Sequence, residues 1–191
     1  MLLRFIFSVP LEGTELIPES LRDIRFSCKR CSKCCQRLEI PLVISDFKLW
    51  VKEGRWDIVA KVRKKQAYGA LRFMGLDFYF TFELNPDGSC VFLRSKRCSI
   101  YEVRPLACRL FPFIYNTEKG IDIHSWAVKN CPGLGSGKNL SVGEIKELSK
   151  LCHKMHKELM DLPMYQDLIE EILGFLRKKN TRTNLNIGSF H

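Results

Sequence analysis

The clearest pattern in the chain is a strict alternation of apolar and polar side chains over residues 77–84, DFYFTFEL. One face of this stretch carries four apolar side chains: Phe78, Phe80, Phe82 and Leu84. Because alternate residues of an extended chain point to the same side, the pattern predicts a strand. A turn is expected at residues 85–88, NPDG, and a return strand at 90–93. A second hairpin is predicted over residues 111–126.

Shorter elements are predicted before the first hairpin. The patterns indicate a first strand at residues 1–10, a short helix at 18–26, a strand at 38–42, and helices at 45–53 and 56–65. Ser45 is the expected N-cap of the helix at 45–53, and Gly54 its end. The Gly-rich residues 133–137 are expected to be a linker, since they lack the strand-to-helix setting and the following lysine of a phosphate loop.

The C-terminal part of the chain has the pattern of two amphipathic helices. Ser141 and Glu144 form a capping box that opens the first of them, and Leu162-Pro163 breaks it. The second is expected to end at Lys178 or Lys179. We expect the two helices to pack on each other as an antiparallel pair.

The cysteine content separates metal binding from disulfide stapling. Nine cysteines in 191 residues are too few for a disulfide scaffold, and 46% hydrophobic residues suffice for an ordinary core. Residues 1–10 have a short apolar run broken by Arg4 and no small-residue cleavage site, so no secretory signal is indicated. The longest apolar runs are strand-sized, so no membrane span is expected. We therefore expect a cytoplasmic protein with reduced thiols, in which clustered cysteines more often bind metal than pair.

Four cysteines lie within eight residues: Cys28, Cys31, Cys34 and Cys35. Two residues between cysteines is the spacing of a metal knuckle, whose turn directs both sulfurs to one ion while backbone N–H groups donate to the thiolates. Adjacent side chains diverge, so Cys34 and Cys35 are not expected to serve one tetrahedral ion, and two centres or one multinuclear cluster follow. We expect Cys28, Cys31 and Cys34 to form most of one site, and Cys35 to face another built from later cysteines.

Three later motifs extend this pattern: GSCVFL at residues 88–93, CSIYEVRPLACRLFPF at 98–113, and Cys131-Pro132. With CxxCxxCC they resemble the YkgJ-type CxxCxxCC family, described as a zinc- or iron-chelating domain, over residues 26–133. The resemblance implies eight metal-binding cysteines: Cys28, Cys31, Cys34, Cys35, Cys90, Cys98, Cys108 and Cys131. Two residues depart from it, since Ser32 stands where glycine is expected and Cys152 lies outside the pattern as an expected buried free thiol.

Thiolate chemistry alone leaves the metal open. Four thiolates suit zinc, whereas the CxxCxxC spacing with a remote Cys-Pro also resembles the ligand run of a ferredoxin-type 4Fe-4S cluster. The predicted fold is α+β, with small antiparallel hairpins and short helices around a cysteine-rich metal centre and a C-terminal helical pair. We expect a cysteine-cluster metal-binding domain at residues 1–137, a C-terminal helical hairpin packed on it at 138–180, and a flexible tail at 181–191.

The chain is basic, with a formal charge of +10 and a pI near 9.2. Eight thiolates holding two divalent ions would reduce the charge to about +6. The run at residues 61–65 lacks the interleaved aromatic residues of a nucleic-acid module, so nucleic acid is not an expected partner. Basic residues next to the cysteines either lower thiol pKa values and offset the charge of a metal–thiolate centre, or form a solvated basic face: Lys29, Arg30, Lys33, Arg37, Arg94, Lys96 and Arg97.

Three residues between and beside the later cysteines are expected to support the ligands. Arg104 and Arg109 are expected to orient the site by donating to sulfur, or to Tyr101 and Glu102. The alternative for Arg104 is a surface ion pair with Glu102. Tyr101 is expected to be a packed side chain rather than a catalytic acid.

Three functions remain compatible with the sequence. The first is a metal-binding protein whose centre is structural or transfers electrons, acting through a protein partner. The second is an iron–sulfur-dependent modifying enzyme, because some members with this pattern are associated with lysine N-methylation of flagellin. No GxGxxG loop and no CxxxCxxC motif support it in this chain. The third is metal chelation for delivery, which needs an exchangeable site.

Overall fold

A computed structural model describes residue 21 and residues 23–187, with side chains up to residue 178. The strand predicted at residues 1–10 lies outside the described residues. The helix predicted at 18–26 falls only partly within them, and there the chain forms a strand at Arg25–Phe26 instead.

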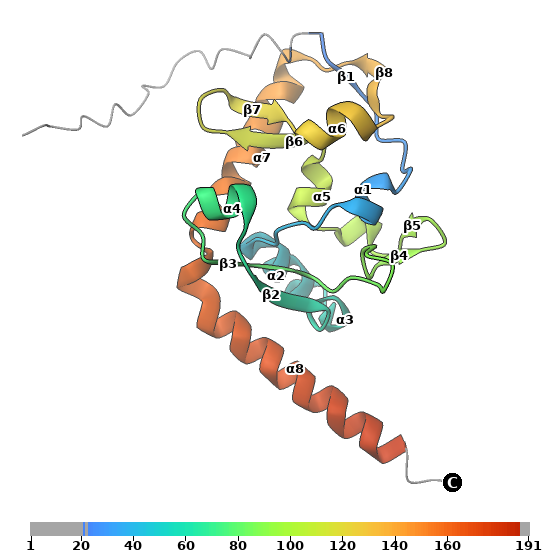
Figure 1. Cartoon of the computed structure of the whole chain (residues 1–191), viewed down its shortest axis with the longest axis vertical. Coiled ribbons are helices and arrows are strands. Elements are labelled where there is room, and N and C mark those ends of the chain that lie inside the picture. Colours follow the sequence, from blue (N-terminus) through green and yellow to red (C-terminus); the bar gives the residue numbers. More distant parts are fainter. Residues whose placement is uncertain (1–20, 22, 188–191) are drawn as a thin grey trace, which may run out of the picture.

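The described chain combines short antiparallel strand pairs with helices, which confirms the α+β class (Figure 1). The paired strands are β1 (Arg25–Phe26) with β8 (Leu134–Asn139), β2 (Val62–Gln66) with β3 (Phe78–Phe82), β4 (Leu93–Arg94) with β5 (Arg97–Cys98), and β6 (Phe113–Asn116) with β7 (Gly120–Ile123). The α-helices are α1 (Lys33–Arg37), α2 (Ile44–Lys52), α3 (Trp56–Val59), α4 (Gly69–Phe73), α5 (Leu106–Leu110), α6 (Ser125–Asn130), α7 (Val142–Met160) and α8 (Gln166–Ile187). Two 3-10 turns are η2 (Tyr101–Val103) and η3 (Leu162–Tyr165).

Strand β3 forms where the alternation predicts it, but its predicted partner is wrong. It pairs along its whole length with β2, whereas the segment after the turn makes only one bridge, Leu84 to Cys90. Tyr79 and Thr81 are buried as fully as the phenylalanines, so both faces of β3 are covered. The helix expected at 56–65 stops at Val59, and its basic end forms β2.

Three further local predictions are wrong. Residues 38–42 make a single bridge from Leu42 to Phe80 rather than a strand, and residues 134–137 of the expected linker belong to β8. The helix at 44–52 is capped at Val43 rather than Ser45. By contrast, the hairpin of β6 and β7 is confirmed, because its turn residues and alternation are local signals.

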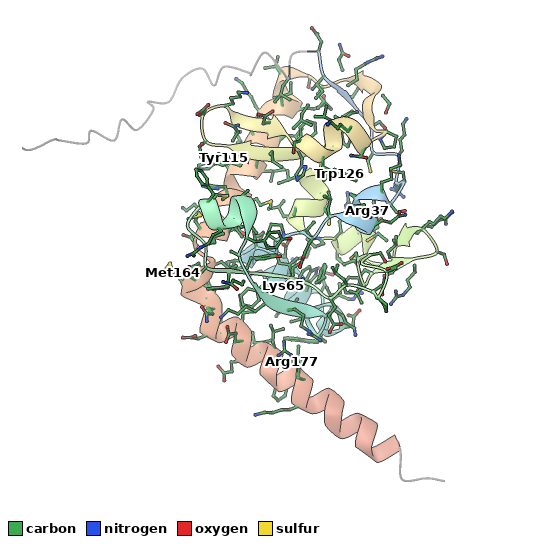
Figure 2. All side chains as sticks on the ribbon, in the orientation of Figure 1. Arg37, Lys65, Tyr115, Trp126, Met164 and Arg177 are labelled. Atoms are coloured by element: carbon green, nitrogen blue, oxygen red, sulfur yellow. The ribbon has the colours of Figure 1, made fainter. Side chains whose placement is uncertain are left out.

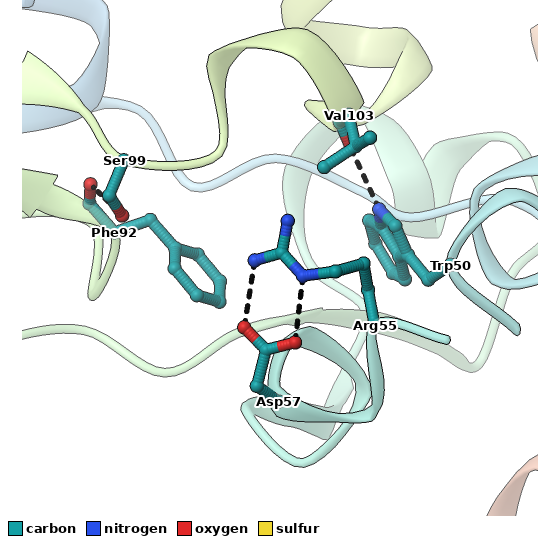
Figure 3. A network of polar contacts seen from close by, with 6 residues as sticks. All are labelled: Trp50, Arg55, Asp57, Phe92, Ser99 and Val103. Atoms are coloured by element: carbon teal, nitrogen blue, oxygen red, sulfur yellow. Dashed lines mark hydrogen bonds and ion pairs between the residues drawn. The ribbon is translucent and has the colours of Figure 1, made fainter. Parts of the chain in front are cut away.

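An aromatic core lies between α2 and β3. The rings of Phe47 and Phe80 are 6.0 Å apart and those of Trp50 and Phe82 are 5.4 Å apart, with Trp50 fully buried. The Trp50 indole donates to the Val103 carbonyl oxygen at 2.8 Å (Figure 3). This bond matters for the site, because it ties the segment between Cys98 and Cys108 to the core.

The C-terminal helices do not form the expected antiparallel pair. The capping box of Ser141 and Glu144 opens α7 as predicted, but α8 leaves η3 in a new direction and extends away from the body (Figure 1). The first half of α8 buries Ile169 and Leu173 in the core. It also runs to Ile187, beyond its expected end. The three-part domain division stays a prediction.

None of the helices in the described part of the chain is both long enough and apolar enough to cross a lipid bilayer.

Candidate metal centre

Three segments far apart in sequence bring five cysteines together. Helix α1 carries Cys34 and Cys35, and the Cys90 backbone N–H donates to the Cys35 carbonyl oxygen at 2.8 Å. The β4–β5 pairing sets Cys98 opposite Leu93, shortly after Cys90, and α5 carries Cys108. Strand pairing and one inter-segment hydrogen bond therefore place these thiols on neighbouring elements.

The electrostatics of these thiols show their proximity. Charge on Cys34 raises the pKa values of Cys90, Cys98 and Cys108, although burial is the largest cause for each of the three. A hydrogen bond between the side chains of Cys34 and Cys35 lowers the pKa of Cys34 to about 7 and raises that of Cys35. Adjacent side chains on α1 thus interact, and the assignment of Cys34 and Cys35 to different ions stays a prediction. We call Cys34, Cys35, Cys90, Cys98 and Cys108 the inner cysteines.

The other three predicted ligands, the outer cysteines, are Cys28, Cys31 and Cys131. Cys28 and Cys31 are exposed, and Cys131 is half-buried. The pairing of β1 with β8 brings their segments together, since the Ser27 N–H donates to the Gly133 carbonyl oxygen at 3.1 Å. A Cβ added to Gly133 would lie 2.7 Å from the Ser27 carbonyl oxygen, so only glycine allows this close approach.

A stack of one aromatic ring and two guanidinium groups connects the two groups of cysteines. The Tyr101 ring has Arg30 at 4.2 Å and Arg104 at 3.8 Å from its centroid, within the range of cation–π attraction. Arg104 also donates to the Tyr101 carbonyl oxygen at 2.6 Å. Because Arg30 lies between two outer cysteines and Tyr101 follows Cys98, the stack fastens the N-terminal loop to the later motif.

Comparisons with known proteins give the family of the chain. The sequence pattern of CxxCxxCC, a domain proposed to chelate zinc or iron, matches residues 27–132, more than half of the chain. The chain belongs to the CxxCxxCC family. The uncharacterized protein MJ0661 of Methanocaldococcus jannaschii is 27% identical to it over 179 residues, which cover 84% of this chain and 89% of that protein. No solved structure matches the chain.

The CxxCxxCC loop of this chain has an unusual backbone. Arg30 and Ser32, on either side of Cys31, have φ angles of 50° and 57°. This left-handed conformation favours glycine, so Ser32 keeps the geometry that the expected glycine would adopt. Its hydroxyl donates to the Cys31 carbonyl oxygen at 2.7 Å, and the residue is buried.

The expected supporting roles of the arginines in the CxxCxxCC domain stay predictions, but their surroundings are defined. Arg104 opposes the burial effect on Cys98, because its positive charge lowers that pKa. No ion pair joins Arg104 to Glu102 within the described residues. Arg109 acts instead on the carboxylate of Asp46, whose pKa its charge lowers.

Asp46 is a buried residue that the sequence analysis missed. Its carboxylate accepts from the N–H of Val43 at 3.0 Å and from the N–H of Leu106 at 2.7 Å. It therefore joins the start of α2 to the start of α5, and so positions Cys108. Burial raises its pKa to about 6 despite these donors. An acidic residue in the first turn of a predicted helix was the available signal.

The thiols of the CxxCxxCC domain are gathered but not arranged as ligands. All nine cysteines are free. Within the part of the chain that the structure describes, no three histidine, cysteine, aspartate or glutamate side chains stand ready to hold a metal ion. Cys152 lies on α7, where burial raises its pKa to about 12.

Proposed function

We propose that this protein binds zinc or an iron–sulfur cluster through the inner and outer cysteines, and that the centre is structural or transfers electrons to a protein partner. The observation that carries the proposal is the convergence of the inner cysteines. Five free thiols from three segments lie half-buried and within electrostatic reach of one another. Such a grouping of soft donors suits zinc or iron.

The division into five inner and three outer cysteines supports two centres. A tetrahedral thiolate site takes four ligands, so the outer cysteines need one more sulfur. Cys34 is suited to this part, since it follows Cys31 at the knuckle spacing. Cys35, Cys90, Cys98 and Cys108 would then form the second site. Because the thiols are not in ligand geometry, we expect metal binding to be coupled to ordering of the loop at residues 28–35.

The test is metal analysis with visible absorption spectroscopy on protein purified without oxygen. Two zinc ions per chain in a colourless protein would favour a structural role, and a brown protein with acid-labile sulfide would favour electron transfer. Protein without metal above trace level would contradict the proposal.

Variants assign the ligands. Cys31→Ser should lower both metal content and the free energy of unfolding, because metal binding and folding are coupled. Cys152→Ser is the matched control, a cysteine on α7 outside the two groups, and its metal content should equal that of the wild type. Full metal retention in Cys31→Ser would remove this residue from the site.

A further inference from the structure

A pocket lies beside the inner cysteines, next to Cys35 and Cys90 in the chain. It has a volume of about 640 Å³ and lies between the end of α1 and the segment from Asn85 to Lys96, which includes Cys90. Figure 2 labels Arg37 on α1 at this side of the molecule. The volume is in the range of small-molecule sites. The lining residues are Gln36, Arg37, Asn85, Pro86, Asp87, Ser89, Leu93, Ser95 and Lys96.

Two polar side chains of the lining, Asp87 and Asn85, are hydrogen-bonded within the pocket wall. One oxygen of Asp87 accepts from the N–H and from the hydroxyl of Ser89, at 2.9 and 2.7 Å. The Asn85 amide donates to the Ser89 hydroxyl and to the Cys90 carbonyl oxygen, both at 3.0 Å. In contrast, Arg37 and Lys96 make no ion pair within the described residues. The charged groups of the lining are therefore two cations, Arg37 and Lys96, and one carboxylate, Asp87, whose Oδ1 is already bonded to Ser89.

The surrounding surface has the same sign. Residues 28–37 and 94–109 together contain nine lysines and arginines and one acidic residue, Glu102. Three of the nine interact with other protein groups. Arg30 and Arg104 make cation–π contacts with Tyr101, and Arg109 interacts electrostatically with Asp46. The other six are exposed. Such a concentration of unpaired cations around a concave site attracts anions.

We infer that this pocket binds a small anionic molecule through its carboxylate or phosphate group, with Arg37 and Lys96 as the binding cations. Arg37 supplies a planar donor fork that can bind two oxygens at once, and Lys96 supplies a second point charge. The inference does not depend on which metal the cysteines hold. The Cys90 N–H donates a hydrogen bond to the Cys35 carbonyl oxygen of α1 beside the pocket, so the ligand would lie next to the inner cysteines.

The experiment is chemical protection of arginine in the intact protein. The protein as purified without oxygen is treated with phenylglyoxal, with inorganic phosphate or succinate added at constant ionic strength, and modification of each arginine is followed by mass spectrometry. Arg97, exposed on the neighbouring hairpin but absent from the pocket lining, is the internal control. We expect at least one anion to protect Arg37 saturably while Arg97 reacts at its unprotected rate.

Two variants of equal charge change complete the design. Lys96→Ala should weaken the protection of Arg37 by about tenfold in apparent Kd, which is the loss of about 1.4 kcal/mol. Lys146→Ala, which removes an exposed lysine on α7, should leave protection unchanged. Equal protection of Arg37 and Arg97, no protection by either anion, or an equal effect of the two variants would each overturn the inference. Loss of metal with protection intact would instead count only against the proposed function.

Discussion

Replacing Tyr101 with leucine tests whether the guanidinium stack fastens the CxxCxxCC loop to the later motif. The change removes the ring that Arg30 and Arg104 contact at 4.2 and 3.8 Å, and it keeps an apolar side chain of moderate size. A cation–π contact contributes about 0.5–1 kcal/mol at an exposed site and about 2 kcal/mol when desolvated. Arg30 is exposed and Arg104 is half-buried. The expected loss is therefore about 1–3 kcal/mol.

The assay has two readings on the metal-loaded protein. One is the free energy of unfolding from denaturant titration, and the other is the rate at which a chelator removes the metal. We expect Tyr101→Leu to lower the free energy of unfolding by about 1–3 kcal/mol. The rate of metal removal by the chelator should rise by about tenfold, since about 1.4 kcal/mol corresponds to a factor of ten. The outer cysteines lie on the loop that Arg30 holds, so release should begin there.

Three controls make the result specific to the ring. Tyr101→Phe keeps the aromatic face and should behave like the wild type. Tyr165→Leu makes the same change in η3, away from the stack, and should not alter metal release. In the Tyr101→Leu background, Arg30→Ala should cause no further loss, because its partner is already absent. The reasoning is refuted if the leucine and phenylalanine variants release metal equally fast, or if the effects of Tyr101→Leu and Arg30→Ala simply add.

Further predictions concern the packing around the site. Gly133→Ala places a Cβ 2.7 Å from the Ser27 carbonyl oxygen, so the pairing of β1 with β8 must open. The free energy of unfolding, measured by denaturant titration, should fall by about 1–3 kcal/mol. An unchanged free energy of unfolding would contradict this prediction. Asp46 has a folded-state pKa of about 6 against an ordinary value of 3.8, so the folded state binds more protons between these values. Its contribution to stability therefore falls by about 3 kcal/mol as pH rises from 4 to 6. Asp46→Asn should flatten this dependence in metal-free protein, and an equal slope in both proteins would assign it to other groups.

Short-range signals in the sequence predicted the elements that depend on neighbouring residues. The alternation of residues 77–84 produced β3, and the reciprocal capping of Ser141 and Glu144 opened α7. These signals did not predict which segments distant along the chain pair with each other. Strand β3 pairs with β2, not with the segment after its own turn, and Tyr79 and Thr81 are buried as well as Phe80 and Phe82. Periodicity along one segment carries no information about which other strand will pair with it.

The sequence by itself determined the chemistry available to this protein: the number of thiols, their spacing, and the excess of basic residues around them. Only the tertiary structure decided which thiols become neighbours. Cys34 and Cys35 lie near Cys90, Cys98 and Cys108 because strand pairs, the Trp50 indole and the Asp46 carboxylate hold three segments in place. These contacts join residues distant along the chain, and they form only when folding buries the groups that make them.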